Sequence, residues 1–78
     1  MENLVTKEYI EESRIDISNR GEEDNHCMIL YKTKGQFNER KSVHAIYKNI
    51  DVFEKKVNKD IDEIDPDFGI SVQLWFFD

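Results

Sequence analysis

Every second residue is apolar near the C-terminal end of the chain, which is the period of a strand with one buried face. The residues expected to face the core are Ile70, Val72, Leu74 and Phe76. The residues expected on the other face are Ser71, Gln73, Trp75 and Phe77, which turn from polar to aromatic. This pattern predicts a strand that opens at Gly69.

Two further segments predict strands nearer the N-terminus. Residues 14–18 alternate apolar and polar side chains, and residues 26–33 contain the unbroken apolar run Cys27–Tyr31. Continuous apolarity over such a length is typical of a strand covered on both faces. A charged turn over residues 19–25 would join the two strands into a hairpin. Residues 3–12 fit either a short helix or an extended lead-in.

Residues 41–64 allow two interpretations. Apolar residues recur at steps of three and four, as in one long amphipathic helix, but residues 42–48 also suit a strand because they are rich in β-branched and aromatic side chains. Asp51 and Glu54 have the spacing of a capping box, which favours a helix beginning near residue 51. We therefore predict a strand over 42–48 and a helix over 52–63, which ends before Pro66. Its core stripe would be Phe53, Val57, Ile61 and Ile64.

The predicted order is β-β-β-α-β, with a possible short N-terminal helix. This is an α+β fold in which one helix packs across a small antiparallel or mixed sheet. Seventy-eight residues suit a single domain, 1–78. Whether residues 41–50 form a strand or a helix stays open at this stage.

Composition supports a folded domain with a heavily charged surface. The chain is 38% hydrophobic, 12% aromatic and 36% charged, whereas disordered chains are usually poor in aromatic residues. Its one cysteine, Cys27, lies in an apolar run and is expected to be a reduced core residue. The first residues are neither basic nor apolar, so we expect no signal peptide, and no apolar run approaches the roughly 20 residues of a membrane span. These features favour a cytoplasmic protein.

The candidate chemistry predicts neither catalysis nor a metal site or cofactor. An EF-hand spacing fails in residues 60–69, because the positions that follow Asp60 and Asp65 do not match the loop. His26 and Cys27 are adjacent and would point to opposite faces of a strand, and with His44 they fall short of the four ligands of structural zinc. No nucleophile is placed beside an oriented base, and no phosphate-binding loop occurs.

Charge is spread unevenly along a chain whose net charge is −6. Residues 1–30 and residues 51–78 each carry eight acidic and three basic side chains, whereas residues 31–50 carry five basic and one acidic. Such a chain is suited to a basic protein partner. The candidate acidic contacts are Glu22, Glu23, Asp24, Asp60, Asp62, Glu63, Asp65 and Asp67.

Trp75 and Phe77 supply the candidate aromatic contacts. If the second face of the last strand is open, they form an exposed patch of the kind that marks interfaces. Together with the acidic residues they predict a small, non-enzymatic inhibitor, immunity protein or antitoxin, which binds and blocks a protein such as a nuclease or nucleic-acid-binding protein. Small size and a Lys/Asn/Ile-rich composition suggest a phage or mobile-element origin.

Two alternatives stay open. One is a nucleic-acid-binding module that uses the basic segment 31–48, although the acidic flanks would repel phosphates. That segment holds Lys32, Lys34, Arg40, Lys41 and Lys48, interleaved with Tyr31, Phe37 and Tyr47. The other is a homo-oligomeric structural subunit, a homodimer in the simplest case, which uses the last strand as its interface.

Overall fold

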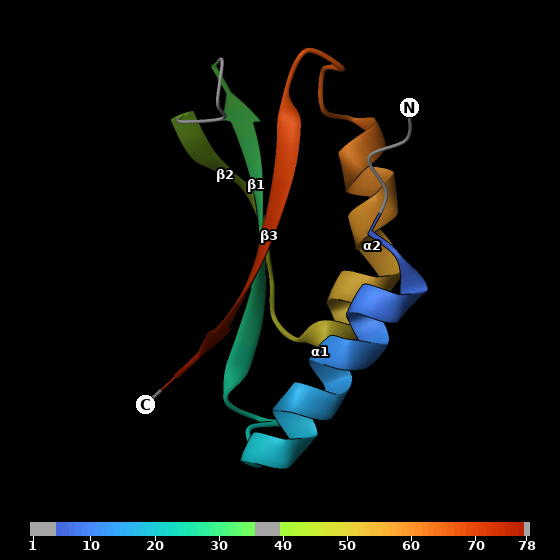
Figure 1. Cartoon of the computed structure of the whole chain (residues 1–78), viewed down its shortest axis with the longest axis vertical. Helices are drawn as coiled ribbons and strands as arrows, with labels where there is room; N and C mark the ends of the chain where they lie inside the picture. Colours follow the sequence, from blue (N-terminus) through green and yellow to red (C-terminus); the bar gives the residue numbers. More distant parts are fainter. Residues whose placement is uncertain (1–4, 36–39, 78) are drawn as a thin grey trace.

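Two helices and three strands make up the computed structural model, which describes residues 5–35 and 40–77 (Figure 1). In chain order they are α1 (Lys7–Arg20), β1 (His26–Lys34), β2 (Arg40–Tyr47), α2 (Ile50–Asp62) and β3 (Gly69–Phe76). The α+β class with a helix packed on a sheet is therefore confirmed. The order α-β-β-α-β differs from the prediction only before residue 26.

The sheet is antiparallel throughout, with strand order β2-β1-β3. In the central strand, Met28 lies opposite Tyr47 of β2 and opposite Leu74 of β3. The register between β1 and β2 shifts after Leu30, where His44 becomes the extra residue of a β-bulge. The end of β3 therefore lies beside the start of β1, where His26 pairs with Phe76, a residue far from it in the chain.

The predicted strand over residues 14–18 is wrong, because these residues belong to α1. Thr6 caps the helix by accepting the backbone N–H of Tyr9, and Gly21 ends it in the left-handed conformation at φ 67°. The alternation was misleading because Ile15 points to solvent, 60% exposed, while Ile17 is buried. The predicted hairpin between residues 14–18 and 26–33 is therefore also wrong. β1 instead pairs with β2 and β3.

The division of residues 41–64 into a strand and a helix is confirmed by β2 and α2. The cap of α2 differs from the prediction, since Asn49 accepts the N–H of Val52 at 3.0 Å. Asp51 and Glu54 instead hold Arg14 of α1, at Nη–O distances of 2.8 and 2.6 Å. These hydrogen bonds raise the pKa of Arg14 and tie the two helices together.

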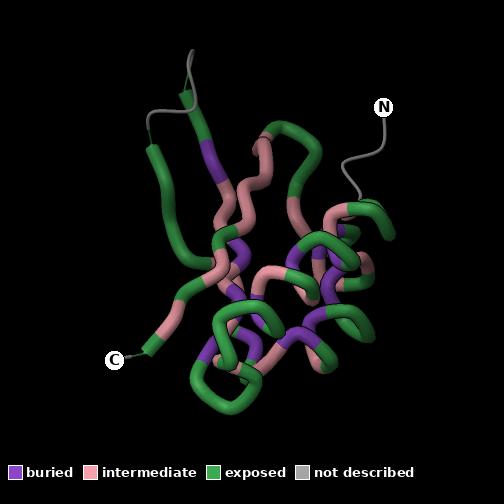
Figure 2. Tube along the Cα trace, turned by 60° about the horizontal axis from the view of Figure 1, so that its bottom comes forward, coloured by how far each residue is buried: buried purple, intermediate pink, exposed green. Residues whose placement is uncertain are grey.

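The core lies between the helices and one face of the sheet, where the buried segments gather (Figures 1 and 2). The predicted stripe of α2 is confirmed, with Ile64 partly buried at its end. The buried apolar residues are Ile10, Ile17, Met28, Leu30, Tyr47, Ile50, Phe53, Val57 and Ile61. From His26 to Tyr31 of β1, buried residues alternate with residues of intermediate exposure, so the second face of this strand is only partly covered and the expectation that both its faces are covered is wrong. Cys27 is one of the intermediate residues, and partial burial raises the pKa of its thiol.

His26, the first residue of β1, joins three segments of the chain. Its ring is buried, and Nδ1 lies 2.9 Å from the carbonyl oxygen of Glu22. Nε2 accepts the backbone N–H of Ile50, the first residue of α2, at 3.0 Å. The histidine therefore fixes the turn after α1 to the start of α2, which is a structural role.

Candidate protein-binding surfaces

The face of the sheet that points away from the helices is covered by no described element (Figure 1). Strand pairing identifies its members, because directly paired residues share a face. Trp75 pairs with Cys27, and Ile29 pairs with both Ile46 and Gln73. We call this surface the open face; its described strand residues are Cys27, Ile29, Tyr31, Thr33, Lys41, Val43, Ile46, Gly69, Ser71, Gln73 and Trp75.

Large apolar side chains of the open face are exposed to solvent. Trp75 is 47% exposed, and Val43 and Ile46 on β2 are more than half exposed. Phe77 continues this region directly after β3, where its N–H donates to the carbonyl of Asn25 at 2.9 Å. The two aromatic residues singled out from the sequence are thus about half exposed.

Charge is nearly missing from the open face, although 36% of the chain is charged. Among its described strand residues only Lys41 carries a charge, and its Nζ lies 5.2 Å from the ring centroid of Tyr31. Depletion of charge together with exposed aromatic residues is typical of the centre of a protein interface.

The eight acidic candidates form two separate groups. Glu22, Glu23 and Asp24 precede β1, and the hydrogen bond between Phe77 and Asn25 brings this turn beside the aromatic end of β3. The other five lie where α2 leads into β3, at the opposite end of the sheet (Figure 1). The structure thus joins the first acidic group to the aromatic residues and keeps the second group apart.

Part of the second acidic group has a structural role. Asp60 accepts the Tyr47 hydroxyl at 2.5 Å, and Asp65 accepts the backbone N–H of Asp67 at 2.9 Å. The side chains of Asp62 and Glu63 are exposed at the end of α2. We therefore place the candidate acidic contacts at residues 22–24 first.

The basic residues of segment 31–48 do not form one stripe. Lys32 and Lys34 lie over the ring of Phe68, at 5.2 and 4.9 Å, whereas Lys41 lies over Tyr31 on the open face. Phe37 lies outside the described residues. The basic residues of the strands therefore divide between the two faces of the sheet, with Lys41 on the open face and the paired Lys34 and Arg40 on the other.

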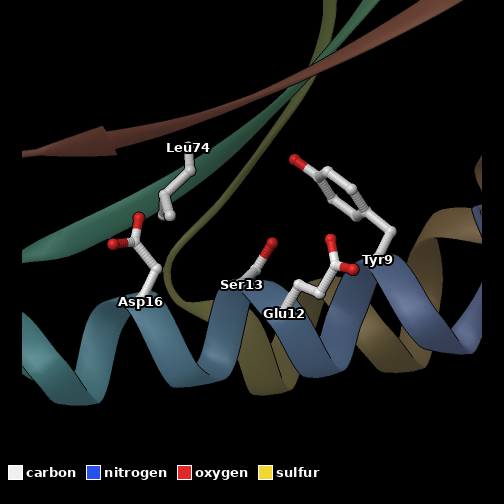
Figure 3. Close-up of a pocket in the computed structure, with 5 residues that line it drawn as sticks. All are labelled: Tyr9, Glu12, Ser13, Asp16 and Leu74. Atoms are coloured by element: carbon white, nitrogen blue, oxygen red, sulfur yellow. The ribbon is translucent and has the colours of Figure 1, made fainter.

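A second surface, which the sequence analysis missed, lies between α1 and β3. Two openings of about 270 Å³ each follow one another along it. One is lined by Tyr9, Glu12, Ser13 and Asp16 of α1 with Leu74 of β3 (Figure 3). The other is lined by Val5, Thr6, Tyr9 and Val72. The signal in the sequence was the spacing of Tyr9, Ser13 and Asp16, which share one side of a helix but not of a strand.

A third opening, of about 310 Å³, lies between α1, the turn before β1 and the start of α2. Arg14 and His26 line it, but both already bind partners within the fold. Across residues 5–35 and 40–77, no three His, Cys, Asp or Glu side chains gather as metal ligands. No helix in those ranges is long and apolar enough to span a membrane.

A comparison of the chain with protein-family models, with curated proteins and with solved structures finds no match.

Proposed function

We propose that this protein is a small, acidic, non-enzymatic binding protein, which docks on a basic protein through the open face and blocks the surface that it covers. The observation that carries the proposal is the near absence of charge around Trp75, Val43 and Ile46 on an uncovered sheet face. Exposed apolar patches of this kind mark interaction surfaces.

The charge of the chain argues for a basic partner rather than a second copy. Two copies would each carry a net charge of −6 and repel one another at low ionic strength. A basic partner would be attracted, and its encounter with the acidic turn 22–24 would bring the neighbouring aromatic residues into contact. Complementary charge mainly raises the association rate, while buried aromatic residues slow dissociation.

A basic partner that normally handles nucleic acid fits this chemistry best. Its phosphate-binding surface is positively charged and would accept the carboxylates of residues 22–24 in place of phosphates. Coverage of that surface would exclude the nucleic acid. The proposed function is therefore that of an inhibitor, immunity protein or antitoxin.

Capture from a host lysate with three immobilised forms of the protein tests the proposal. These are the unchanged chain, Trp75→Ser, and Ile15→Ser as the matched control, since Ile15 is an exposed apolar residue on α1. We expect one dominant basic protein to be captured by the unchanged chain and by Ile15→Ser. Trp75→Ser should retain at least tenfold less of it, and the association rate should fall as salt is added.

Two results would overturn the proposal. One is a partner that Trp75→Ser captures as well as the unchanged chain does. The other is a dimer in light scattering that Trp75→Ser converts to a monomer, which would assign the open face to self-association. A captured nuclease whose activity the chain leaves unchanged would retain binding but contradict the blocking role.

A further inference from the structure

The outer edge of β3 is a free strand edge next to the surface between α1 and β3. Among the residues that the structure describes, β3 pairs only with β1, which leaves the N–H and C=O groups of its other edge without a strand partner. Such an edge is a template for an extended segment of another chain. The two openings lie along this strand. A segment that pairs with the backbone of β3 could therefore also be recognised through its side chains.

The spacing of the openings matches the period of a strand. One opening lies on Val72 and the other on Leu74, and Tyr9 lines both. Residues two apart in a strand are separated by roughly 6.5 to 7 Å and point to the same face. A strand added beside β3 has the same period, so two of its side chains, also two residues apart, would enter the two openings together.

The two openings differ in chemistry. The opening on Val72 has no charged lining residue, which suits an apolar side chain. The opening on Leu74 is lined by Glu12 and Asp16, whose side chains extend from α1 toward the sheet beside the hydroxyl of Ser13 (Figure 3). A lysine or arginine fits this second opening, because its stem can pack on Leu74 while its charge reaches the carboxylates.

Arg20 limits the recognition surface to these two positions. Its guanidinium lies 4.4 Å from the ring centroid of Phe76, and so covers the next residue of β3 on the same face. Its Nε also donates to Asp16 at 3.1 Å, but this ion pair is exposed and exposed pairs contribute little. Asp16 can therefore accept a second cation.

We infer that the α1–β3 surface binds an extended peptide segment, which adds to β3 as a strand and is recognised by an apolar residue and a basic residue two positions apart. Each opening is smaller than the roughly 300 to 1,000 Å³ of typical small-molecule pockets and suits a single side chain. The site faces the helices rather than the open face, so the inference is independent of the proposed function.

A seven-residue peptide with blocked ends, bearing valine and lysine two positions apart in a threonine background, is the probe. Its binding is followed through the amide signals of the isotope-labelled protein in NMR. We expect shifts concentrated at β3 and at α1 around Tyr9 and Glu12, and binding at least tenfold weaker when glutamate replaces the lysine. Methylation of every second backbone nitrogen of the peptide should abolish binding for one of the two alternating sets of nitrogens, because only one set donates its N–H groups to β3.

Matched variants separate recognition from folding. Glu12→Gln should weaken binding of the lysine peptide by about threefold to tenfold, while Glu11→Gln, the neighbouring exposed carboxylate on α1, should leave it unchanged. Trp75→Ser should also leave it unchanged, since Trp75 faces the other way from Leu74. Equal binding of the lysine, glutamate and methylated peptides, shifts that centre on the open face, or no binding at millimolar peptide would each overturn the inference.

Discussion

The two faces of the sheet are made by the same three strands, but the side chains of one face are buried and those of the other are largely exposed. On the face that meets the helices, Met28 and Leu30 of β1 are fully buried beneath Phe53 and Val57. On the open face, large apolar side chains stay about half exposed, although Trp75 follows Leu74 directly in the chain. The fold is therefore held together from one side, and the side chains of the other side are available for binding.

The burial of β3 is intermediate between that of the two faces. Its helix-facing residues, such as Val72 and Leu74, are only partly buried, although they pack against the core. The reason is that α2 packs over β1 and β2, while openings remain between α1 and β3. A sheet of three strands covered by two helices thus leaves one strand accessible on both its face and its edge.

Truncation of Phe53 should have the largest effect on the covered side. Phe53→Ala removes a fully buried ring and should lower the free energy of unfolding by about 3 to 5 kcal/mol. This is much of the stability of a small domain, so urea denaturation would show a largely unfolded protein. Val57→Ala, a smaller cavity in the same stripe, should give a measurable two-state transition with a smaller loss.

Tyr47→Phe, at the end of β2, should have an intermediate effect. It removes the hydrogen bond to Asp60, which should cost about 1 kcal/mol at neutral pH. Burial, with the Asp60 carboxylate beside it, raises the pKa of Tyr47 well above its usual value near 10. The hydroxyl must stay protonated in the fold, so its contribution is complete below about pH 10 and is lost as the pH rises through the raised pKa.

Denaturation from pH 7 to pH 11 measures this dependence. The difference in stability between the unchanged chain and Tyr47→Phe should shrink or reverse above pH 10. Tyr31→Phe on the open face serves as the control, and an alkaline profile that Tyr47→Phe shares with the unchanged chain would contradict the assignment.

Trp75→Ser should have the smallest effect on stability and so gives the sharpest test of the comparison. Because its side chain is already half exposed, the free energy of unfolding should fall much less than in Phe53→Ala, while capture of a basic partner is lost. Trp75 is the single tryptophan of the chain, so its fluorescence reports directly on the open face. A loss of stability near that of Phe53→Ala would show that the open face contributes to the stability of the fold as much as the covered face does.

The sequence predicted β3 and α2 because each has one continuous apolar side and clear ends. It failed at α1, where Ile15 faces solvent and Ser13 is buried, so that apolar residues do not mark the helix face. The better signals there were the two ends, Thr6 as a cap and Gly21 as a stop, which lie one helix length apart.

The candidate site was predictable only where it depends on one strand. The alternation within residues 70–77 was enough to predict that Trp75 and Leu74 lie on opposite faces of the strand. The proximity of Phe77 to the acidic turn 22–24 requires the pairing of β1 with β3, and the openings beside α1 require a helix that alternation had concealed. Contacts between distant segments follow from topology, which local patterns do not contain.

The buried ring of His26 carries a further consequence. Because Nε2 must accept from Ile50 while the other nitrogen faces a carbonyl oxygen, only the tautomer with its hydrogen on Nδ1 satisfies both neighbours. In the unfolded chain the two tautomers exchange freely. The NMR nitrogen resonances of this one imidazole would therefore report on folding, because they change when the end of α1, the start of β1 and the start of α2 have come together.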